Sequence, residues 1–99
     1  MRPYAIQFTF ESDISLAEAE MSLHLAMFAV EGLIGRVRVR LDAIYQINDS
    51  RHAIIVDAGR AAGRLIVRVF TALLLREFGE DPFTVERINQ FSVPQTMET

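Results

Sequence analysis

Apolar and polar residues alternate over 36–57, which is the pattern of a β-sheet with one buried face. The alternation stops at 48–50, Asn-Asp-Ser, a composition typical of turns, so the stretch predicts two strands folded back as a hairpin. A shift of one residue in the pairing would bury three guanidinium groups, which makes the register firm. The outward positions of the first strand therefore carry a row of arginines: Arg36, Arg38 and Arg40.

The residues before this hairpin predict a strand and then a helix. Alternating apolar residues, most of them aromatic, predict a strand over 3–10. Ser15 and Glu18 have the spacing of a capping box, in which each side chain satisfies a free backbone N–H, so a helix is expected to begin there. Gly32 and Gly35 can each supply the left-handed position that ends a helix, and the sequence does not choose between them.

The residues after the hairpin predict a second helix and a last strand. Asp57 is expected to cap a helix over 58–78, which Gly79 ends. Alternation returns over 83–88 and predicts a short fourth strand. The segment 91–99 contains a proline and few apolar side chains, and we expect it to be a loose tail.

This order of elements, β-α-β-β-α-β, is that of the ferredoxin-like split βαβ motif. We therefore predict an α+β fold in which two helices cover one face of a four-stranded antiparallel sheet. A chain of 99 residues has the size of one domain, which we place at 1–90. Four side chains are expected to share its core: Phe8, Val39, Ile54 and Val85.

The predicted order, with its strand, helix, hairpin and arginine-bearing helix, resembles that of a protein subunit of archaeal and eukaryotic ribonuclease P. The resemblance covers topology over most of the chain and extends to no specific motif. It implies association with RNA, although a pI near 5.3 departs from the basic character usual in RNA-bound subunits.

The composition narrows the classes of protein. Hydrophobic residues make up 51% of the chain, which is typical of a folded domain, and the net charge of -3 disfavours a general nucleic-acid or anionic-membrane binder. All ten cationic side chains are Arg, which suits pairing with carboxylate or phosphate, but codon bias in a GC-rich genome is the simpler explanation. Without cysteine, a signal-peptide pattern or a long apolar run, we expect a soluble cytoplasmic protein with no membrane association.

The start of the second helix is the best candidate for binding a small anion or a nucleotide. Free backbone N–H groups at a helix N-terminus attract negative charge, and glycines allow close approach. The spacing matches neither a P-loop nor a dinucleotide-binding fingerprint, and Asp57 would repel an anion, so close helix packing is the alternative. The candidate residues are Gly59, Arg60, Gly63 and Arg64.

Two groups of charged residues lie on the predicted outer face of the hairpin. With Ile47 opposite His52, Asp42 would face Asp57, and two facing carboxylates can share a proton or a divalent cation. The alternative is that Asp57 caps the helix while nearby arginines neutralise the pair. The row of three arginines could contact phosphates, but this face lacks aromatic residues on which bases could stack, so nucleic acid is disfavoured as a partner.

No residue pattern supports catalysis or a bound cofactor. Glu20 and His24 stand one helical turn apart and could reach one metal ion, but a surface ion pair is the simpler interpretation because no third ligand is near. No serine or threonine has the sequence context of an activated nucleophile. We therefore predict no metal, no cofactor and no enzymatic activity.

The first helix has two apolar stripes, and a helix lying on a sheet can bury only one of them. We expect the second stripe to form the interface of a homo-oligomer, most simply a dimer, although the open sheet face could serve instead. The leading hypothesis is thus a self-associating binding domain; an anion or nucleotide sensor is the alternative, and an RNA-associated subunit is the third. The residues of the second stripe are Ala17, Met21, Leu25 and Phe28.

Overall fold

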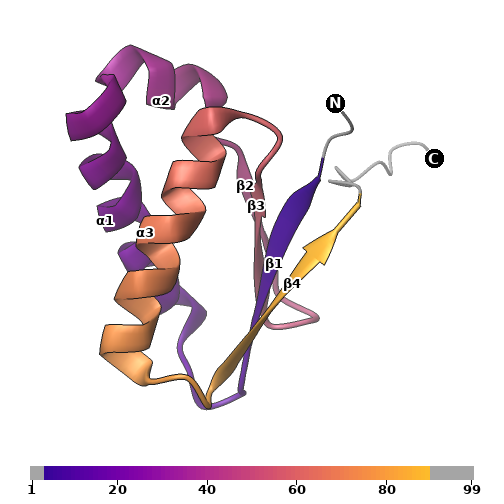
Figure 1. Cartoon of the computed structure of the whole chain (residues 1–99). Coiled ribbons are helices and arrows are strands. Elements are labelled where there is room, and N and C mark those ends of the chain that lie inside the picture. Colours follow the sequence, from indigo (N-terminus) through magenta and orange to yellow (C-terminus); the bar gives the residue numbers. More distant parts are fainter. Residues whose placement is uncertain (1–3, 90–99) are drawn as a thin grey trace.

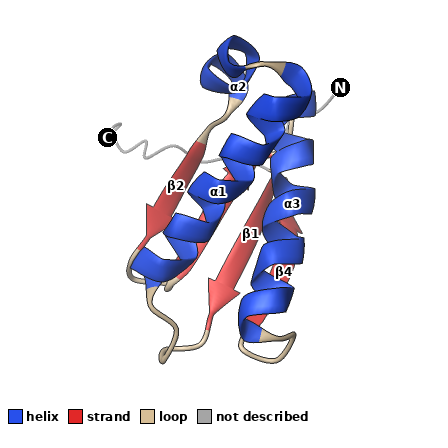
Figure 2. Cartoon of the chain, turned by 90° about the vertical axis from the view of Figure 1, so that its left-hand side faces the viewer, coloured by secondary structure: helices blue, strands red, loops and turns tan. Residues whose placement is uncertain are grey.

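The computed structural model describes residues 4–89 and has an α+β fold, as predicted. Its four strands form one antiparallel sheet in the order β2-β3-β1-β4, and α1 and α3 lie side by side over one face of it (Figures 1 and 2). The segment 91–99, expected to be a loose tail, lies outside the described residues. The elements in chain order are β1 (Ala5–Phe10), α1 (Leu16–Ile34), α2 (Arg36–Asp42), β2 (Tyr45–Asn48), β3 (Ala53–Asp57), α3 (Ala61–Phe78) and β4 (Phe83–Ile88).

The local signals around α1 are confirmed. The helix begins after Ser15, whose Oγ accepts a hydrogen bond of 3.2 Å from the backbone N–H of Glu18. Of the two candidate glycines, Gly35 ends the helix: its φ of +97° is one that residues with a side chain rarely adopt. Gly32 lies inside the last turn of α1.

The prediction of a long strand over 36–47 is wrong, because residues 36–42 form the short helix α2 at one end of the molecule (Figure 2). The reason lies in β3, which contributes only five residues to the sheet before the chain turns toward α3. A longer partner strand would leave most of its backbone N–H and C=O groups unpaired. A helix satisfies these groups internally, and arginine, the commonest residue in this segment, favours helices.

The hairpin register also differs from the prediction. Ile47 pairs with Ile54 and not with His52, a shift of two residues. Because side chains alternate with a period of two, this shift leaves the inward residues of both strands inward. Asn48 stabilises the turn, since its side-chain oxygen accepts a hydrogen bond of 3.2 Å from the N–H of Arg51.

The second long helix begins three residues later than predicted. Its N-cap is Arg60, while Asp57 accepts a hydrogen bond of 3.0 Å from the N–H of Gly59 and so stabilises the turn before the helix. The helix ends before Gly79, as predicted, with φ of +81° at that glycine. Gly63 lies against the end of β3: a Cβ added there would come within 2.0 Å of the Asp57 carbonyl oxygen.

The core lies between the helices and the sheet. Phe8 and Ile54 are fully buried on neighbouring strands, and Val39 joins them from α2, so three of the four predicted core residues are found there. Val85 is 44% exposed, because β4 is an edge strand and neighbours the sheet on one side only. The Phe8 and Phe70 rings meet edge to face, with centroids 4.7 Å apart, which fastens α3 to β1.

Candidate functional site

The outer surface of α1 is apolar and exposed. We call Ala17, Met21, Leu25 and Phe28 the α1 stripe. Met21, Leu25 and Phe28 are 64%, 59% and 73% exposed, whereas Leu23 and Val30, which belong to the first apolar stripe of the helix, are fully buried. The structure thus leaves the α1 stripe on the surface of the helix layer.

A shallow groove lies beside the α1 stripe, between α1 and α3. Met21 and Leu25 line it from α1, and Leu73 lines it from α3. Beneath it the Ser22 hydroxyl donates a 2.6 Å hydrogen bond to a carboxylate oxygen of Glu77, which joins the two helices. The groove is therefore a stable feature of the helix layer that the side chains of a partner could enter.

Other exposed apolar side chains lie at the end of α1 and on α2. Leu33, Val37 and Leu41 are 70%, 70% and 72% exposed. Because α2 buries only Val39, its other apolar residues face outward. Exposed apolar side chains are therefore found on α2 as well as on α1.

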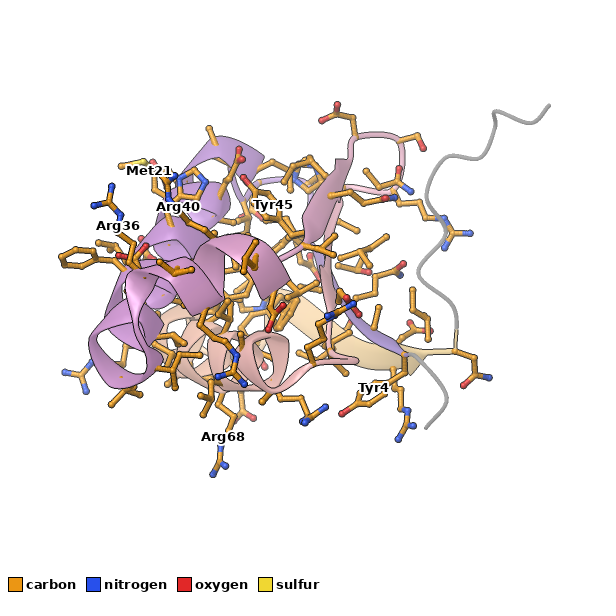
Figure 3. The ribbon with its side chains drawn as sticks, turned by 90° about the horizontal axis from the view of Figure 1, so that it is seen from above. Tyr4, Met21, Arg36, Arg40, Tyr45 and Arg68 are labelled. Atoms are coloured by element: carbon orange, nitrogen blue, oxygen red, sulfur yellow. The ribbon has the colours of Figure 1, made fainter. Side chains whose placement is uncertain are left out.

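The predicted row of arginines does not form, because the three residues lie on the helix α2, where Arg38 does not share a face with Arg36 and Arg40. The Arg38 Nε lies 3.4 Å from a carboxylate oxygen of Asp42. Arg36 and Arg40 are exposed and stand one helical turn apart (Figure 3). These arginines are therefore not placed to contact a nucleic acid on the open face of the sheet.

The predicted carboxylate pair does not form through strand pairing, because Asp42 ends α2 and lies in no strand. Its carboxylate is held by two arginines, Arg38 and Arg60, with the Arg60 Nη1 at 3.5 Å. Asp57 pairs through its backbone N–H with the Ile44 carbonyl oxygen, and its side chain holds the following turn. The arrangement is that of two structural carboxylates.

The four residues proposed for anion binding at the second helix have separate contacts. Gly59 donates to Asp57, Arg60 contacts Asp42, and Gly63 packs against the backbone at the end of β3. Arg64 also lines a cavity. Close packing against β3 therefore explains why a glycine occupies position 63.

Arg64 belongs to a cavity that the sequence analysis missed. This cavity, which we call the Tyr4 pocket, has a volume of about 530 Å³ and lies between the start of β1 and the first half of α3. The spacing of Arg64 and Arg68, one helical turn apart, was the available signal; nothing in the sequence indicated that Tyr4 would join them. Its lining includes Tyr4, Ile6, Ala61, Arg64, Leu65 and Arg68.

Glu20 and His24 are joined by a third residue, Tyr45 of β2. The Tyr45 hydroxyl donates a 2.6 Å hydrogen bond to Glu20 and lies 2.9 Å from the His24 Nε2, which is 3.8 Å from the Glu20 carboxylate. Burial, with the hydrogen bond to Glu20 and its negative charge, raises the pKa of Tyr45 to about 12. Within residues 4–89 no group of three or more His, Cys, Asp or Glu side chains could hold a metal ion.

We expect the stability of the protein to fall as the pH rises from about 10 to about 12, in part through Tyr45. The unfolded chain releases this proton near pH 10 and the folded chain near pH 12, so ionisation favours unfolding in that interval. Tyr45→Phe should remove this part of the pH dependence. Thermal melts of the natural chain and the variant between about pH 10 and about pH 12 test this prediction. If the melting temperatures of both proteins fell equally with pH, Tyr45 would not be the group responsible.

Charge is distributed unevenly along the helix axes. Figure 1 shows α2 and the start of α3 at one end of the molecule, and the start of α1 and the end of α3 at the other. In the sequence, arginines are concentrated in the segments at the first end and carboxylates in those at the second. The protein therefore has a basic and an acidic end. The basic end carries Arg36, Arg38, Arg40, Arg60, Arg64 and Arg68 against Glu31, Asp42 and Asp57, and the acidic end carries Glu11, Asp13, Glu18, Glu77, Glu80 and Asp81 against Arg76.

Comparisons with protein-family models, with curated proteins and with solved structures gave no match to this chain. None of the helices described between residues 4 and 89 combines the length and the apolarity needed to cross a membrane.

Proposed function

We propose that this protein is a self-associating binding domain that forms a homodimer through the α1 stripe. The observation that carries the proposal is the exposure of three large apolar side chains along one helix: Met21, Leu25 and Phe28. Contiguous apolar surface of this kind is usually covered by a partner in solution. Twofold symmetry is the commonest way for a single surface to close upon itself.

The distribution of charge supports an antiparallel arrangement of the two α1 helices. Arg36 lies eleven residues after Leu25, and Asp13 lies twelve residues before it. A twofold axis crossing α1 near Leu25 would therefore bring the basic end of each copy to the acidic end of the other. Opposite charges at the rim favour this orientation over the parallel one.

Sedimentation at micromolar concentration tests the proposal. We expect the mass of a dimer for the natural chain, and the mass of a monomer when Met21 and Leu25 are both replaced by Glu, because each copy would then place two carboxylates in an apolar interface. Both residues are exposed, so the folded structure should survive, which circular dichroism would verify. A monomer mass for the natural chain would refute the proposal.

A matched variant separates the loss of the interface from a general effect of added charge. Leu75 of α3 is 45% exposed and lies outside the α1 stripe. Leu75→Glu should leave the dimer intact, whereas Leu25→Glu should weaken it. Equal weakening by both single variants would mean that the α1 stripe is not the interface.

We also propose that the fold is ferredoxin-like. In support, the sheet read from its other edge has the order β4-β1-β3-β2, and each half of the chain supplies a strand, a long helix and a second strand. On this interpretation α2 is an extra helix between α1 and β2. It adds the exposed Val37 and Leu41 to the surface of the helix layer.

A further inference from the structure

We propose that the Tyr4 pocket binds a small organic anion in which a carboxylate or phosphate group is joined to an apolar body. This site differs from the α1 stripe, and the inference does not depend on dimer formation. In Figure 3, Tyr4 and Arg68 lie on one side of the molecule, while Met21 and Arg40 lie on the other.

The size and the apolar lining of the pocket favour a small ligand with an apolar part. A volume of about 530 Å³ lies within the range of small-molecule sites, roughly 300–1,000 Å³. Most of the wall is apolar, and Ile6 from the sheet, Leu65 from α3 and Tyr4 contribute to it. An inorganic anion would leave this apolar surface uncovered, so the ligand needs an apolar or aromatic part.

The arginines that line the pocket favour a ligand with a negatively charged head group. Arg64 and Arg68 both line the pocket and are one helical turn apart on α3. Among residues 4–89, neither has a carboxylate oxygen within 4.0 Å, and no acidic residue lines the pocket. Guanidinium groups bind carboxylates and phosphates through paired hydrogen bonds, so an anionic head group would complete the site.

The backbone at the start of α3 holds Arg64 in place. The Arg64 Nη1 donates a 3.2 Å hydrogen bond to the Ala58 carbonyl oxygen, and this contact uses only one of the five N–H donors of the guanidinium. Gly63 makes the contact possible, because its missing side chain lets the first turn of α3 lie directly on the end of β3. Arg64 is thus positioned before any ligand arrives, which lowers the entropic cost of binding.

A third arginine, Arg87, contacts the ring of Tyr4. The Arg87 guanidinium carbon lies 4.0 Å from the centroid of the Tyr4 ring, within the range of a cation–π contact. The contact fixes a ring that lines the pocket. It also adds a positive charge beside that ring, which favours an anion over a neutral molecule of the same shape.

Titration with four small probes, followed by the amide chemical shifts in NMR spectra, tests the proposal. The probes are benzoate, phenyl phosphate, benzyl alcohol and inorganic phosphate. We expect benzoate or phenyl phosphate at millimolar concentration to shift the amides of residues 4–6 and 58–68. Benzyl alcohol, which lacks the charge, and inorganic phosphate, which lacks the apolar body, should bind about tenfold or more weakly.

Substitutions on α3 provide the control. Arg68→Gln should weaken binding of the aromatic anion about tenfold, because one charge-assisted partner is lost. Arg76→Gln removes an arginine of the same helix that lies outside the Tyr4 pocket and should leave binding unchanged. The proposal is overturned if neither aromatic anion shifts these amides, if both variants behave alike, or if the shifts map to the α1 stripe.

Discussion

Replacement of Phe8 by Ala should lower the free energy of unfolding by about 3–5 kcal/mol, the usual cost of removing a buried phenylalanine ring. Phe8 is fully buried on a central strand and packs edge to face on Phe70. The substitution removes the contact between α3 and β1 and leaves a cavity beneath both helices. Because whole domains are stable by about 5–15 kcal/mol, the variant should be close to unfolding.

Urea unfolding followed by circular dichroism measures this loss. Natural chain and variant must be compared at one protein concentration, because association would add to the apparent stability. Val85→Ala is the matched control: Val85 pairs with Phe8 across the sheet but is 44% exposed, so its loss should cost less than about 1 kcal/mol. Unchanged stability of the Phe8 variant would show that the core is assigned wrongly.

Replacement of Gly63 by Ala should destabilise the protein by about 1–3 kcal/mol, although alanine is normally the better helix former by about 1 kcal/mol. A methyl group at this position would meet the Asp57 carbonyl oxygen at 2.0 Å, so α3 would have to move away from β3. The contact is with backbone, which cannot rotate aside as a flexible side chain can.

Replacement of Gly32 in α1 by Ala should have the opposite effect on stability. A Cβ added there meets no atom within 4 Å, so Gly32→Ala should stabilise the protein by up to about 1 kcal/mol through helix propensity alone. Thermal melts of the two variants should therefore move in opposite directions. If both glycine variants gained stability equally, the close approach of α3 to β3 would be refuted.

Signals that depend on neighbouring residues in the chain correctly identified the start of α1 and the end of α3, although the start of α3 was predicted three residues too early. The hydrogen bond between Ser15 and Glu18 starts α1, and Gly79 ends α3. Period-two alternation identified β1, which buries Phe8 and Phe10, and also β4, although that edge strand buries only Phe83. Such signals are reliable because all the atoms involved lie within one or two turns of the chain.

The same alternation misled over 36–42, where the sequence reads as a strand and the chain forms α2. A strand needs a partner along its whole length, and β3 is too short to supply one. Two candidate sites depended on this predicted strand, and neither forms as predicted. In the structure Asp42 contacts Arg38 and Arg60, and the three arginines of the predicted row lie on α2.

The sequence by itself determined the α+β class, the four strands, both long helices and the two apolar stripes of α1. Each of these follows from residue spacing and local hydrogen bonding, which act within a segment. Only the tertiary structure decided the length of β2, the close approach of Gly63 to Asp57, and the assembly of the Tyr4 pocket from β1 and α3. These features depend on how far a partner strand extends and on which segments meet in space, and no spacing within a single segment encodes either.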